Sequence, residues 1–321
     1  MSEPLLVSVI IPCFMRPDLV RAAVESVFAQ DLEKDQFELI VVDSSPDDQV
    51  IRVLEELRPA TTCRFAFFHK KPEGPGPSRN LGAAHARAPL LALLDSDCIA
   101  SPGWLRNGIA AFRDGIGLVQ GRTLPEPGVH RGVFSKYVLV ERESFIYEGC
   151  NMFFRRDVYL EFSEDVPDPR STSLLIQGGE DVILAWKAKR GGWLSTFSPE
   201  ALVHHKVLPI TPWRWVYIHN NLMWPYLLRR IPELRPFFFG RFFFEPSQAW
   251  FTLALAAVPL FLVTKWAALL FLPYVVCRAR ERTHSLRGPL RLLRPLFYLP
   301  RDACNFFLLL RGSLRFRTIL L

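Results

Sequence analysis

Short β-branched runs alternate with segments of helical spacing from the start of this chain to about residue 97. In chain order, the expected elements are a strand at 6–11, a helix at 17–30, a strand at 37–42, a helix at 50–57, a strand at 64–69, a helix at 77–87 and a strand at 89–94. Strand–helix–strand alternation implies a mostly parallel sheet with helices on both faces. We therefore expect an α/β fold for this part of the chain.

A second segment, from residue 117 to residue 205, carries a mixed pattern. Its expected strands are 117–121, 149–155 and 193–198, and its expected helices are 156–162 and 180–189. Near residue 213 the composition turns aromatic and basic, with tryptophans and tyrosines between arginines. We accordingly divide the chain into an α/β domain, residues 1–212, and a helical C-terminal region, residues 213–321.

Acidic residues follow two of the expected strands. Asp43 ends the second strand, and Asp95 and Asp97 follow the fourth. In open parallel sheets, ligands bind at the carboxyl ends of the strands, where these carboxylates lie. A lone Asp-x-Asp is most often a solvated turn, but Arg79 beside a glycine-rich loop adds a position suited to a diphosphate. Oxygen ligands of this kind suit Mg²⁺ or Mn²⁺, whose coordination is completed by substrate phosphates.

A pair of acids and a pair of histidines follow later in the same domain. Glu180 and Asp181 open an expected helix, where acidic residues commonly stabilise the first turn through the helix dipole. One of the two carboxylates can instead act as the general base that takes a proton from an acceptor hydroxyl. His204 and His205 end the mixed segment. A lone histidine is more often structural, but a neutral imidazole near the Asp-x-Asp carboxylates can complete a metal site.

Six motifs, in this order, resemble those of the family 2 glycosyltransferases of the GT-A fold. They are Val7-Ser-Val-Ile-Ile-Pro12, Ile40-Val-Val-Asp43, Gly76-Pro-Ser-Arg79-Asn80-Leu-Gly82, Leu93-Leu-Asp95-Ser-Asp97, Gly149-Cys-Asn151 and Gly179-Glu180-Asp181. Each motif alone is weakly specific, and together they run from about Val7 to His205. The resemblance implies a GT-A domain, which is a Rossmann-like, mostly parallel sheet flanked by helices. We expect a helical, membrane-associated C-terminal region, residues 213–321, to follow this domain.

The resemblance implies roles on the donor side of the site. Pro12 and Asp43 would hold the nucleobase of a nucleoside-diphosphate sugar. Arg79 would lie near the nucleotide, and Asp95 would lie beside the ribose. Ser44 replaces the second acid that usually follows the position of Asp43 in the family, so the identity of the nucleobase stays open.

The resemblance also implies roles in the reaction. Asp97 would bind Mg²⁺ or Mn²⁺, with His204 as an additional ligand. Asp181, with Glu180 beside it, would be the base for direct displacement at the anomeric carbon, which inverts the configuration there. The metal and Arg79 would stabilise the charge that grows on the departing diphosphate.

The Gln-x-x-Arg-Trp motif of processive polysaccharide synthases is missing, because Pro212-Trp-Arg-Trp215 lacks the glutamine. We therefore expect the transfer of one sugar per encounter. The donor sugar and the acceptor depend on the loops at 124–147 and 162–176. The sequence leaves both open, together with the oligomeric state.

The C-terminal region contains a long apolar stretch, residues 249–277, whose single charge is Lys265. Each arm beside Lys265 is shorter than the about 20 apolar residues that cross a bilayer. One crossing helix would place Lys265 near mid-bilayer, at a cost of about 2.5–3.5 kcal/mol. Arginines flank both ends, and basic flanks favour the cytoplasmic side. A hairpin that dips in from that side therefore fits better than a span, and a buried pair of soluble helices is the third interpretation.

Basic residues exceed acidic ones by 39 to 32 in the chain, and the C-terminal region combines its arginines with aromatic and leucine-rich runs. This mixture favours an anionic membrane surface over nucleic acid. Residues 301–321 are typical of an amphipathic helix lying on such a surface.

Glu3 and Pro12 argue against a secretory signal peptide, and the scattered cysteines suit reduced thiols. We therefore expect the cytoplasmic face of a membrane.

Three functional hypotheses follow. The first is a transferase that acts on a lipid or lipid-linked glycan in cell-envelope glycan biosynthesis, with the C-terminal region raising the effective concentration of acceptor. The second is the same transferase acting on a soluble acceptor. The third is a non-catalytic, membrane-bound nucleotide-sugar sensor. The presence of Asp95, Asp97 and Asp181 argues against it, because a sensor needs no base. A dinucleotide oxidoreductase is disfavoured because no Gly-x-Gly-x-x-Gly follows the first strand.

Overall fold

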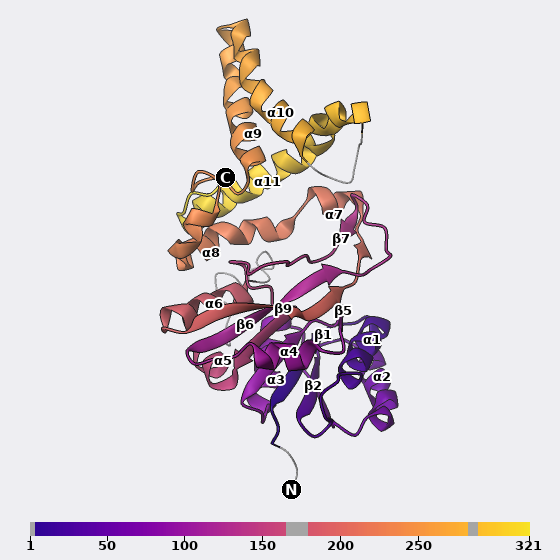
Figure 1. Cartoon of the computed structure of the whole chain (residues 1–321). Helices are drawn as coiled ribbons and strands as arrows, with labels where there is room; N and C mark the ends of the chain where they lie inside the picture. Colours follow the sequence, from indigo (N-terminus) through magenta and orange to yellow (C-terminus); the bar gives the residue numbers. More distant parts are fainter. Residues whose placement is uncertain (1–3, 165–178, 282–287) are drawn as a thin grey trace. The chain divides into compact units, whose positions relative to one another are not determined.

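The structure, a computed structural model, describes residues 4–164, 179–281 and 288–321 (Figure 1). Its internal contacts divide the chain into two compact units. The α/β unit comprises the described residues up to Val207 other than 130–136, and the helical unit comprises 130–136 and the residues from Leu208 onward. Most of the loop expected at 162–176 lies outside the described residues.

Strands and helices alternate along the α/β unit. Its strands are β1 (Val7–Cys13), β2 (Phe37–Asp43), β3 (Arg64–His69), β4 (Leu90–Leu94), β5 (Cys98–Ala100), β6 (Ile116–Pro125), β8 (Asn151–Arg155) and β9 (Leu194–His205). Its helices are α1 (Pro17–Phe28), α2 (Gln49–Leu57), the 3₁₀ turn η1 (Arg58–Ala60), α3 (Pro75–His85), α4 (Trp104–Ala110), α5 (Arg156–Phe162) and α6 (Glu180–Arg190). Each strand and helix that the sequence predicts between residues 6 and 198 is present.

The strands form one eight-stranded sheet in the order β3-β2-β1-β4-β8-β6-β9-β5. The first four are parallel, β8 is antiparallel to both of its neighbours, and β6 and β9 pair in parallel. In register, Cys13 lies opposite Asp43, and Ile10 lies opposite Leu93. Asp43 and the Asp95 turn therefore leave the sheet at the same edge. The mostly parallel sheet with flanking helices confirms the predicted α/β fold.

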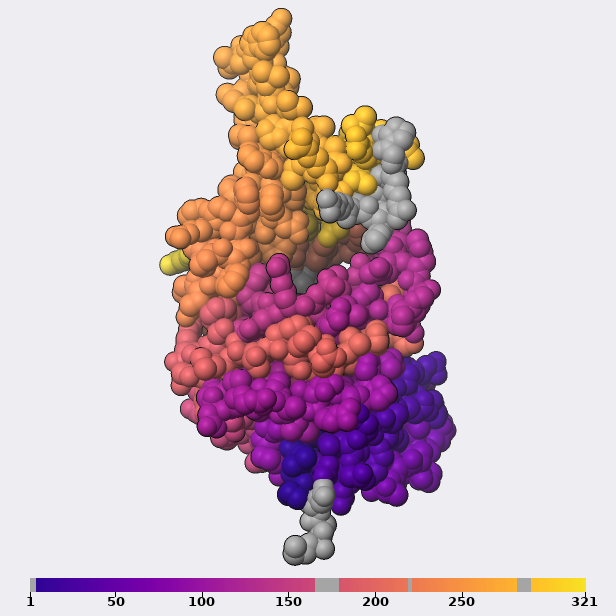
Figure 2. All heavy atoms as spheres, in the orientation of Figure 1, coloured from indigo at the N-terminus to yellow at the C-terminus, as the bar shows by residue number. Residues whose placement is uncertain are grey.

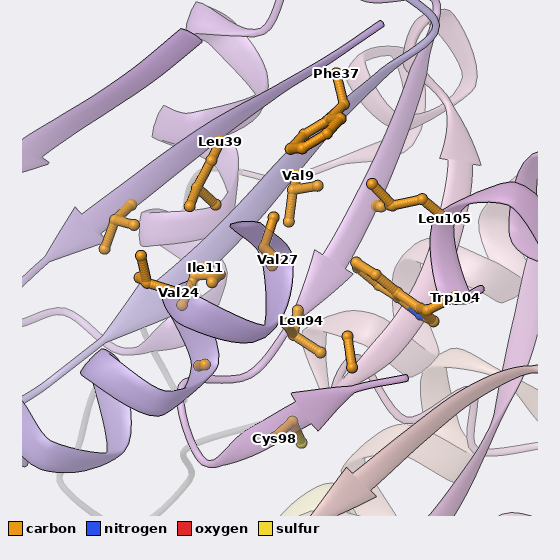
Figure 3. Close-up of a cluster of buried hydrophobic side chains, with 14 of the residues drawn as sticks. Val9, Ile11, Val24, Val27, Phe37, Leu39, Leu94, Cys98, Trp104 and Leu105 are labelled. Carbon is orange, nitrogen blue, oxygen red and sulfur yellow. The ribbon is translucent and has the colours of Figure 1, made fainter. Parts of the chain in front are cut away.

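Helices cover both faces of the sheet, so its central strands are apolar on both sides. On β1, Val9 and Ile11 pack toward α1 and α4, in a cluster that contains Val24, Val27 and Trp104 (Figure 3). The alternate residue, Ile10, packs on the other face in a cluster with side chains of α3, α5 and α6. Side chains alternate across a strand, so the continuous β-branched run of the sequence fits a strand buried on both faces.

Three features of the α/β unit do not follow from the sequence pattern. Strand β5 has only three residues, and α4 has seven, too few for a periodic signal. Strand β9 continues to His205 although it contains Pro199. The pairing of β6 with β9 shifts register after Gly121. This irregularity accommodates Pro199, which has no backbone N–H to donate.

The helical unit consists of short helices and one two-stranded ladder. Its elements are β7 (Ser135–Lys136), β10 (Leu208–Pro209), α7 (Pro212–Val216), η2 (His219–Met223), α8 (Trp224–Arg230), η3 (Pro232–Phe237), α9 (Pro246–Ala257), η4 (Pro259–Leu262), η5 (Lys265–Phe271), α10 (Leu272–Arg280), η6 (Gly288–Leu293) and α11 (Arg294–Phe316). The helix expected at 301–321 corresponds to α11, which begins earlier because Pro300 does not interrupt it and ends at Phe316.

The apolar stretch 249–277 is folded back on itself. Helix α9 ends at Ala257, the chain reverses through η4 and η5, and α10 returns beside α9 (Figure 1). We call α9 to α10 the apolar hairpin. Among the described residues, no helix has both the length and the apolar character needed to cross a membrane. The hairpin form agrees with the division of this stretch at Lys265.

Candidate active site

Asp43 lies at the end of β2, fully buried among polar partners. Its Oδ1 accepts hydrogen bonds from the Ser45 amide at 3.0 Å and from the Ser45 hydroxyl at 2.6 Å. Its Oδ2 lies 3.1 Å from Nδ1 of His69, at the end of β3. The Cys13 thiol lies 3.7 Å from Oδ1, and burial, followed by the charge of Asp43, raises the pKa of that thiol. The sequence predicts Asp43 at this edge but does not indicate how completely it is enclosed.

Pro12 and Ser44 form the neighbouring strand ends. Pro12 is buried on β1 opposite Val42. The Ser44 hydroxyl donates to the Cys13 carbonyl at 3.1 Å, so it ties β2 to β1. In this chain, the position of the family's second acid therefore links two strands.

Arg79 is almost fully buried on α3 and joins two acidic motifs. Its guanidinium lies 2.6 Å from Asp95 and 3.3 Å from Glu180. Burial alone would lower the pKa of Arg79, but the neighbouring carboxylates more than offset this and raise it, so the side chain is charged. A Cβ at Gly149 would lie 3.0 Å from the guanidinium, so a residue without a side chain fits this position. The structure thus brings Arg79, Asp95 and Glu180 together.

Asp181 is half-buried in the first turn of α6. Its Oδ2 accepts from the Gly149 amide at 2.8 Å, and its Oδ1 accepts from the Val182 amide at 2.9 Å. Loss of hydration, followed by the charge of Glu180, raises the pKa of Asp181 to about 7, while Arg79 lowers it. A carboxyl with this pKa is suited to general base catalysis near neutral pH. The Gly149 loop and the acidic pair, two separate motifs in the sequence, therefore meet in the structure.

Asp97 lies between an imidazole and a guanidinium. Its Oδ1 is 3.5 Å from Nε2 of His205, and its Oδ2 is 3.8 Å from Arg16. Donor atoms of Asp97, Cys98 and His205 lie within 4.8 Å of one another. A hydrogen bond with the neighbouring Cys150, followed by burial, raises the pKa of the Cys98 thiol, which leaves the carboxylate and the imidazole as the available ligands. An oxygen and a nitrogen donor beside an expected diphosphate fit Mg²⁺ or Mn²⁺.

The imidazole beside Asp97 belongs to His205, whereas the sequence predicts His204 in this role. Successive side chains of a strand point to opposite faces, and β9 pairs His205 with Cys98, next to Asp97. His204 points to the other face, where the charge of Glu126 acts on it. The two histidines are adjacent in sequence, so only the register of β9 against β5 separates them.

Four residues of this edge are missed by the sequence motifs: Arg16, Ser45, His69 and His205. Arg16 and Met15 both have positive φ, 58° and 60°, in the left-handed region that favours glycine. The Met15 amide donates to the Ser45 hydroxyl at 2.6 Å, which helps to hold this loop. Two of them have a signal in the sequence, because His69 ends a predicted strand of the parallel sheet and His205 ends the mixed segment.

Comparison with known proteins identifies the family of the domain that carries this edge. Residues 8–161 match the model of glycosyl transferase family 2. The chain therefore contains a domain of glycosyl transferase family 2. Its matched segment contains Asp43, Arg79, Asp95 and Asp97 but ends before Asp181.

Curated relatives are similar in sequence to parts of this chain. It is 28% identical over 213 residues to the glycosyltransferase AglE of Haloferax volcanii, covering 63% of this chain and 67% of AglE. It is 29% identical over 107 residues to the poly(ribitol-phosphate) β-N-acetylglucosaminyltransferase TarS of Staphylococcus aureus, covering 33% of this chain and 18% of TarS. The chain thus spans about two thirds of AglE and under a fifth of TarS.

Solved structures share the fold of this family 2 member. The mannosyltransferase PcManGT of Pyrobaculum calidifontis, in complex with GDP-Man and Mn²⁺, superposes with a TM-score of 0.59 at 16% identity, covering 98% of this chain and 88% of PcManGT. Residues 1–349 of S. aureus TarS, in complex with UDP-GlcNAc, give a TM-score of 0.51 at 17% identity, covering 98% and 93%. At these identities, the similarity is one of fold alone.

Proposed function

We propose that the chain transfers one sugar from a nucleoside-diphosphate sugar to an acceptor hydroxyl, with inversion at the anomeric carbon. The observation that carries this proposal is the setting of Asp181. Its carboxyl is fixed by two backbone amides and has a pKa of about 7. Through Glu180 and Arg79 it is linked to Asp95 at the carboxyl edge of the sheet. A positioned base beside a nucleotide edge is what direct displacement requires.

The donor lies along the carboxyl ends of β1, β2 and β4. Pro12 and Asp43 line the base side, and Asp95 lies on the ribose side. Arg79 is enclosed by carboxylates, so it acts chiefly by fixing Asp95 and Glu180. The relatives support a nucleotide sugar as donor, since PcManGT was solved with GDP-Man and TarS with UDP-GlcNAc.

Asp97 and His205 hold a divalent cation, Mg²⁺ or Mn²⁺. The cation, when bound, supplies positive charge that stabilises the diphosphate leaving group. The donor set of one carboxylate and one imidazole supports this assignment, as does the Mn²⁺ of the PcManGT complex. His204 has no part in it, because β9 turns its side chain to the opposite face.

Asp181 takes the proton of the attacking hydroxyl. The Gly149 and Val182 amides orient its carboxylate, and loss of hydration, followed by the charge of Glu180, keeps its pKa high enough for it to act as a base. Attack on the face opposite the diphosphate inverts the anomeric carbon. The Gln-x-x-Arg-Trp motif is missing, which supports one transfer per encounter.

The acceptor is a lipid or lipid-linked glycan at the cytoplasmic face of a membrane, as in the synthesis of cell-envelope glycans. The apolar hairpin supports this assignment. At its reversal, the exposed fractions of Leu262, Val263 and Trp266 are 91%, 83% and 69%. The hairpin projects from the rest of the helical unit (Figure 2). Between Glu245 and Glu281 there is no acidic residue. Such a surface suits the interface of an anionic membrane.

A donor panel tests the transferase. Full-length protein in detergent is incubated with Mn²⁺ or Mg²⁺ and one nucleotide sugar at a time, and release of nucleoside diphosphate is measured. We expect release with one donor, stimulated by a lipid extract, and an inverted anomeric centre by NMR. Stimulation by soluble glycans alone would favour the soluble-acceptor hypothesis. Binding of a nucleotide sugar without any transfer would favour the sensor.

A further inference from the structure

Four contacts surround the carboxylate of Asp43. Its carboxylate is fully buried. Oδ1 accepts from the amide and the hydroxyl of Ser45 and lies 3.7 Å from the Cys13 thiol. Oδ2 lies 3.1 Å from Nδ1 of His69. Because the Asp43 side chain is 0% exposed, a nucleobase N–H cannot reach either oxygen unless one of these partners moves aside.

Of the groups in contact with Asp43, the imidazole of His69 is exposed. Its side chain is 53% exposed, whereas that of Asp43 is 0% exposed. Because a carboxylate only accepts hydrogen bonds, Nδ1 of His69 carries the proton in this contact. In the neutral ring, Nε2 is then a hydrogen-bond acceptor. Ser45 and His69 hold Asp43 from two sides, and Asp43 in turn fixes the tautomer of His69.

We propose that His69 reads the nucleobase of the donor by accepting a hydrogen bond from a ring N–H, with Asp43 as a positioning residue behind it. Uracil, thymine and guanine carry a ring N–H on their pairing edge. Cytosine and adenine present a lone pair at the corresponding ring nitrogen, which would face the lone pair of Nε2. The site therefore takes uridine, thymidine or guanosine diphosphates. This inference rests on the proposed function, which places a nucleotide at this edge.

Other groups near Asp43 are less suited to this role. Lys70, next in the chain, is 16% exposed and pairs with Glu73 at 2.5 Å. The Ser45 hydroxyl donates to Asp43 and accepts from the Met15 amide. His69 is thus the ring at the strand ends that is both anchored from behind and open to a ligand. A histidine that only shields Asp43 would affect stability without affecting the choice of nucleotide.

Isothermal titration calorimetry on the full chain with Mn²⁺ tests the inference, with UDP, GDP, CDP and ADP as probes. We expect the wild type to bind UDP or GDP at least about tenfold more tightly than CDP and ADP. His69→Ala should weaken the preferred nucleotide about tenfold and leave CDP and ADP within about twofold. His69→Gln, whose amide can donate to Asp43 and present a carbonyl outward, should keep part of the preference. If thermal melting shows that His69→Ala folds poorly, His69→Gln is the variant that tests the inference.

His85→Ala is the matched control. His85 is exposed in the last turn of α3, where Nδ1 lies 2.9 Å from the Leu81 carbonyl and the ring contacts Phe68. It should keep wild-type affinities. Unchanged discrimination in His69→Ala, or a wild type that prefers CDP or ADP, would overturn the inference alone. Binding of no nucleotide by the wild type would overturn both the inference and the proposed function.

Discussion

Opposing influences act on the carboxyl of Asp181. Enclosure and the charge of Glu180 raise its pKa, whereas Arg79 and the amides of Gly149 and Val182 lower it. The resulting pKa of about 7 lies near neutral pH, where about half of the carboxyl groups are deprotonated and the base is strong enough to take a proton. The side chain of Asp181 is therefore a base whose strength is set by opposing influences of its neighbours.

The pH dependence of the reaction follows from this pKa. Only the deprotonated carboxylate accepts the proton of the acceptor, so kcat/KM should fall about tenfold per pH unit below about pH 7 and level off above it. Initial rates between pH 5 and 9, at fixed cation concentration, check the profile. A rate that is flat from pH 5 upward would show that Asp181 keeps an ordinary carboxyl pKa and would contradict this account.

Residue types and strand ends predict Asp43, Asp95, Asp97 and Asp181, because each follows a recognisable element boundary. The partners of these acids are not predictable in the same way. His205 rather than His204 faces Asp97 because of the register of β9, and register depends on pairing between distant strands. Burial of Arg79 between two carboxylates likewise depends on how α3 and α6 meet.

Among the elements, the loop before β8 controls the spacing between Arg79 and Asp181. Gly149→Ala would place a methyl group 3.0 Å from the Arg79 guanidinium and displace the amide that holds Asp181. We expect kcat to fall about tenfold to a hundredfold, with nucleotide affinity within about threefold. In Gly132→Ala, the new methyl meets only the Ser135 hydroxyl at 3.9 Å, so activity should be unchanged. Equal activity of the two variants would contradict this role of the loop.

A buried ion pair joins the base of the apolar hairpin to α11. Asp302 is fully buried and accepts from Nε of Arg278 at 2.8 Å and from the Tyr274 hydroxyl at 2.7 Å. Asp302→Ala leaves the buried Arg278 without this partner, which should lower the free energy of unfolding by about 3–5 kcal/mol. Arg280→Gln, an exposed change on the same helix, should alter it by at most about 0.5 kcal/mol. Denaturant titrations in detergent compare them, and similar midpoints would contradict the role of the pair.

Element prediction succeeds where periodicity is long and fails where elements are short. Strands β1 to β4 and helices α1 to α3 follow from β-branched runs, helical spacing and turn residues. Strand β5 and helix α4 are too short to show a period, and α4 is placed by burial of Trp104 against Phe153. The hairpin follows from Lys265 because one charge divides an apolar stretch that is otherwise long enough to be read as a span.

At the scale of the molecule, the two units carry different halves of the proposed function. The α/β unit carries the donor edge and the base, and the helical unit carries the exposed apolar hairpin. In the proposed function, the hairpin keeps the protein near a membrane-bound acceptor, and it contains no residue of the candidate active site.

Membrane association is tested on the exposed reversal of the hairpin. The double change Leu262→Asp and Val263→Asp should weaken binding to vesicles that contain anionic lipid by at least about tenfold, because two charges replace apolar surface that would be buried in the interface. Nucleotide affinity should not change. Leu194→Asp, at an equally apolar and 61% exposed position of the α/β unit, is the control. Vesicle binding that survives the double change would contradict the docking surface.

The most direct test of the central claim compares nucleoside diphosphate release by Asp181→Asn and Asp157→Asn. Asp157 occupies the first turn of α5, where its Oδ1 accepts from the Val158 amide at 2.9 Å, as Asp181 does from Val182. Loss of the base should lower the turnover of Asp181→Asn about a hundredfold or more with donor binding retained, while Asp157→Asn stays near wild type. Turnover of Asp181→Asn within a few-fold of wild type would contradict the assignment of Asp181 as the base.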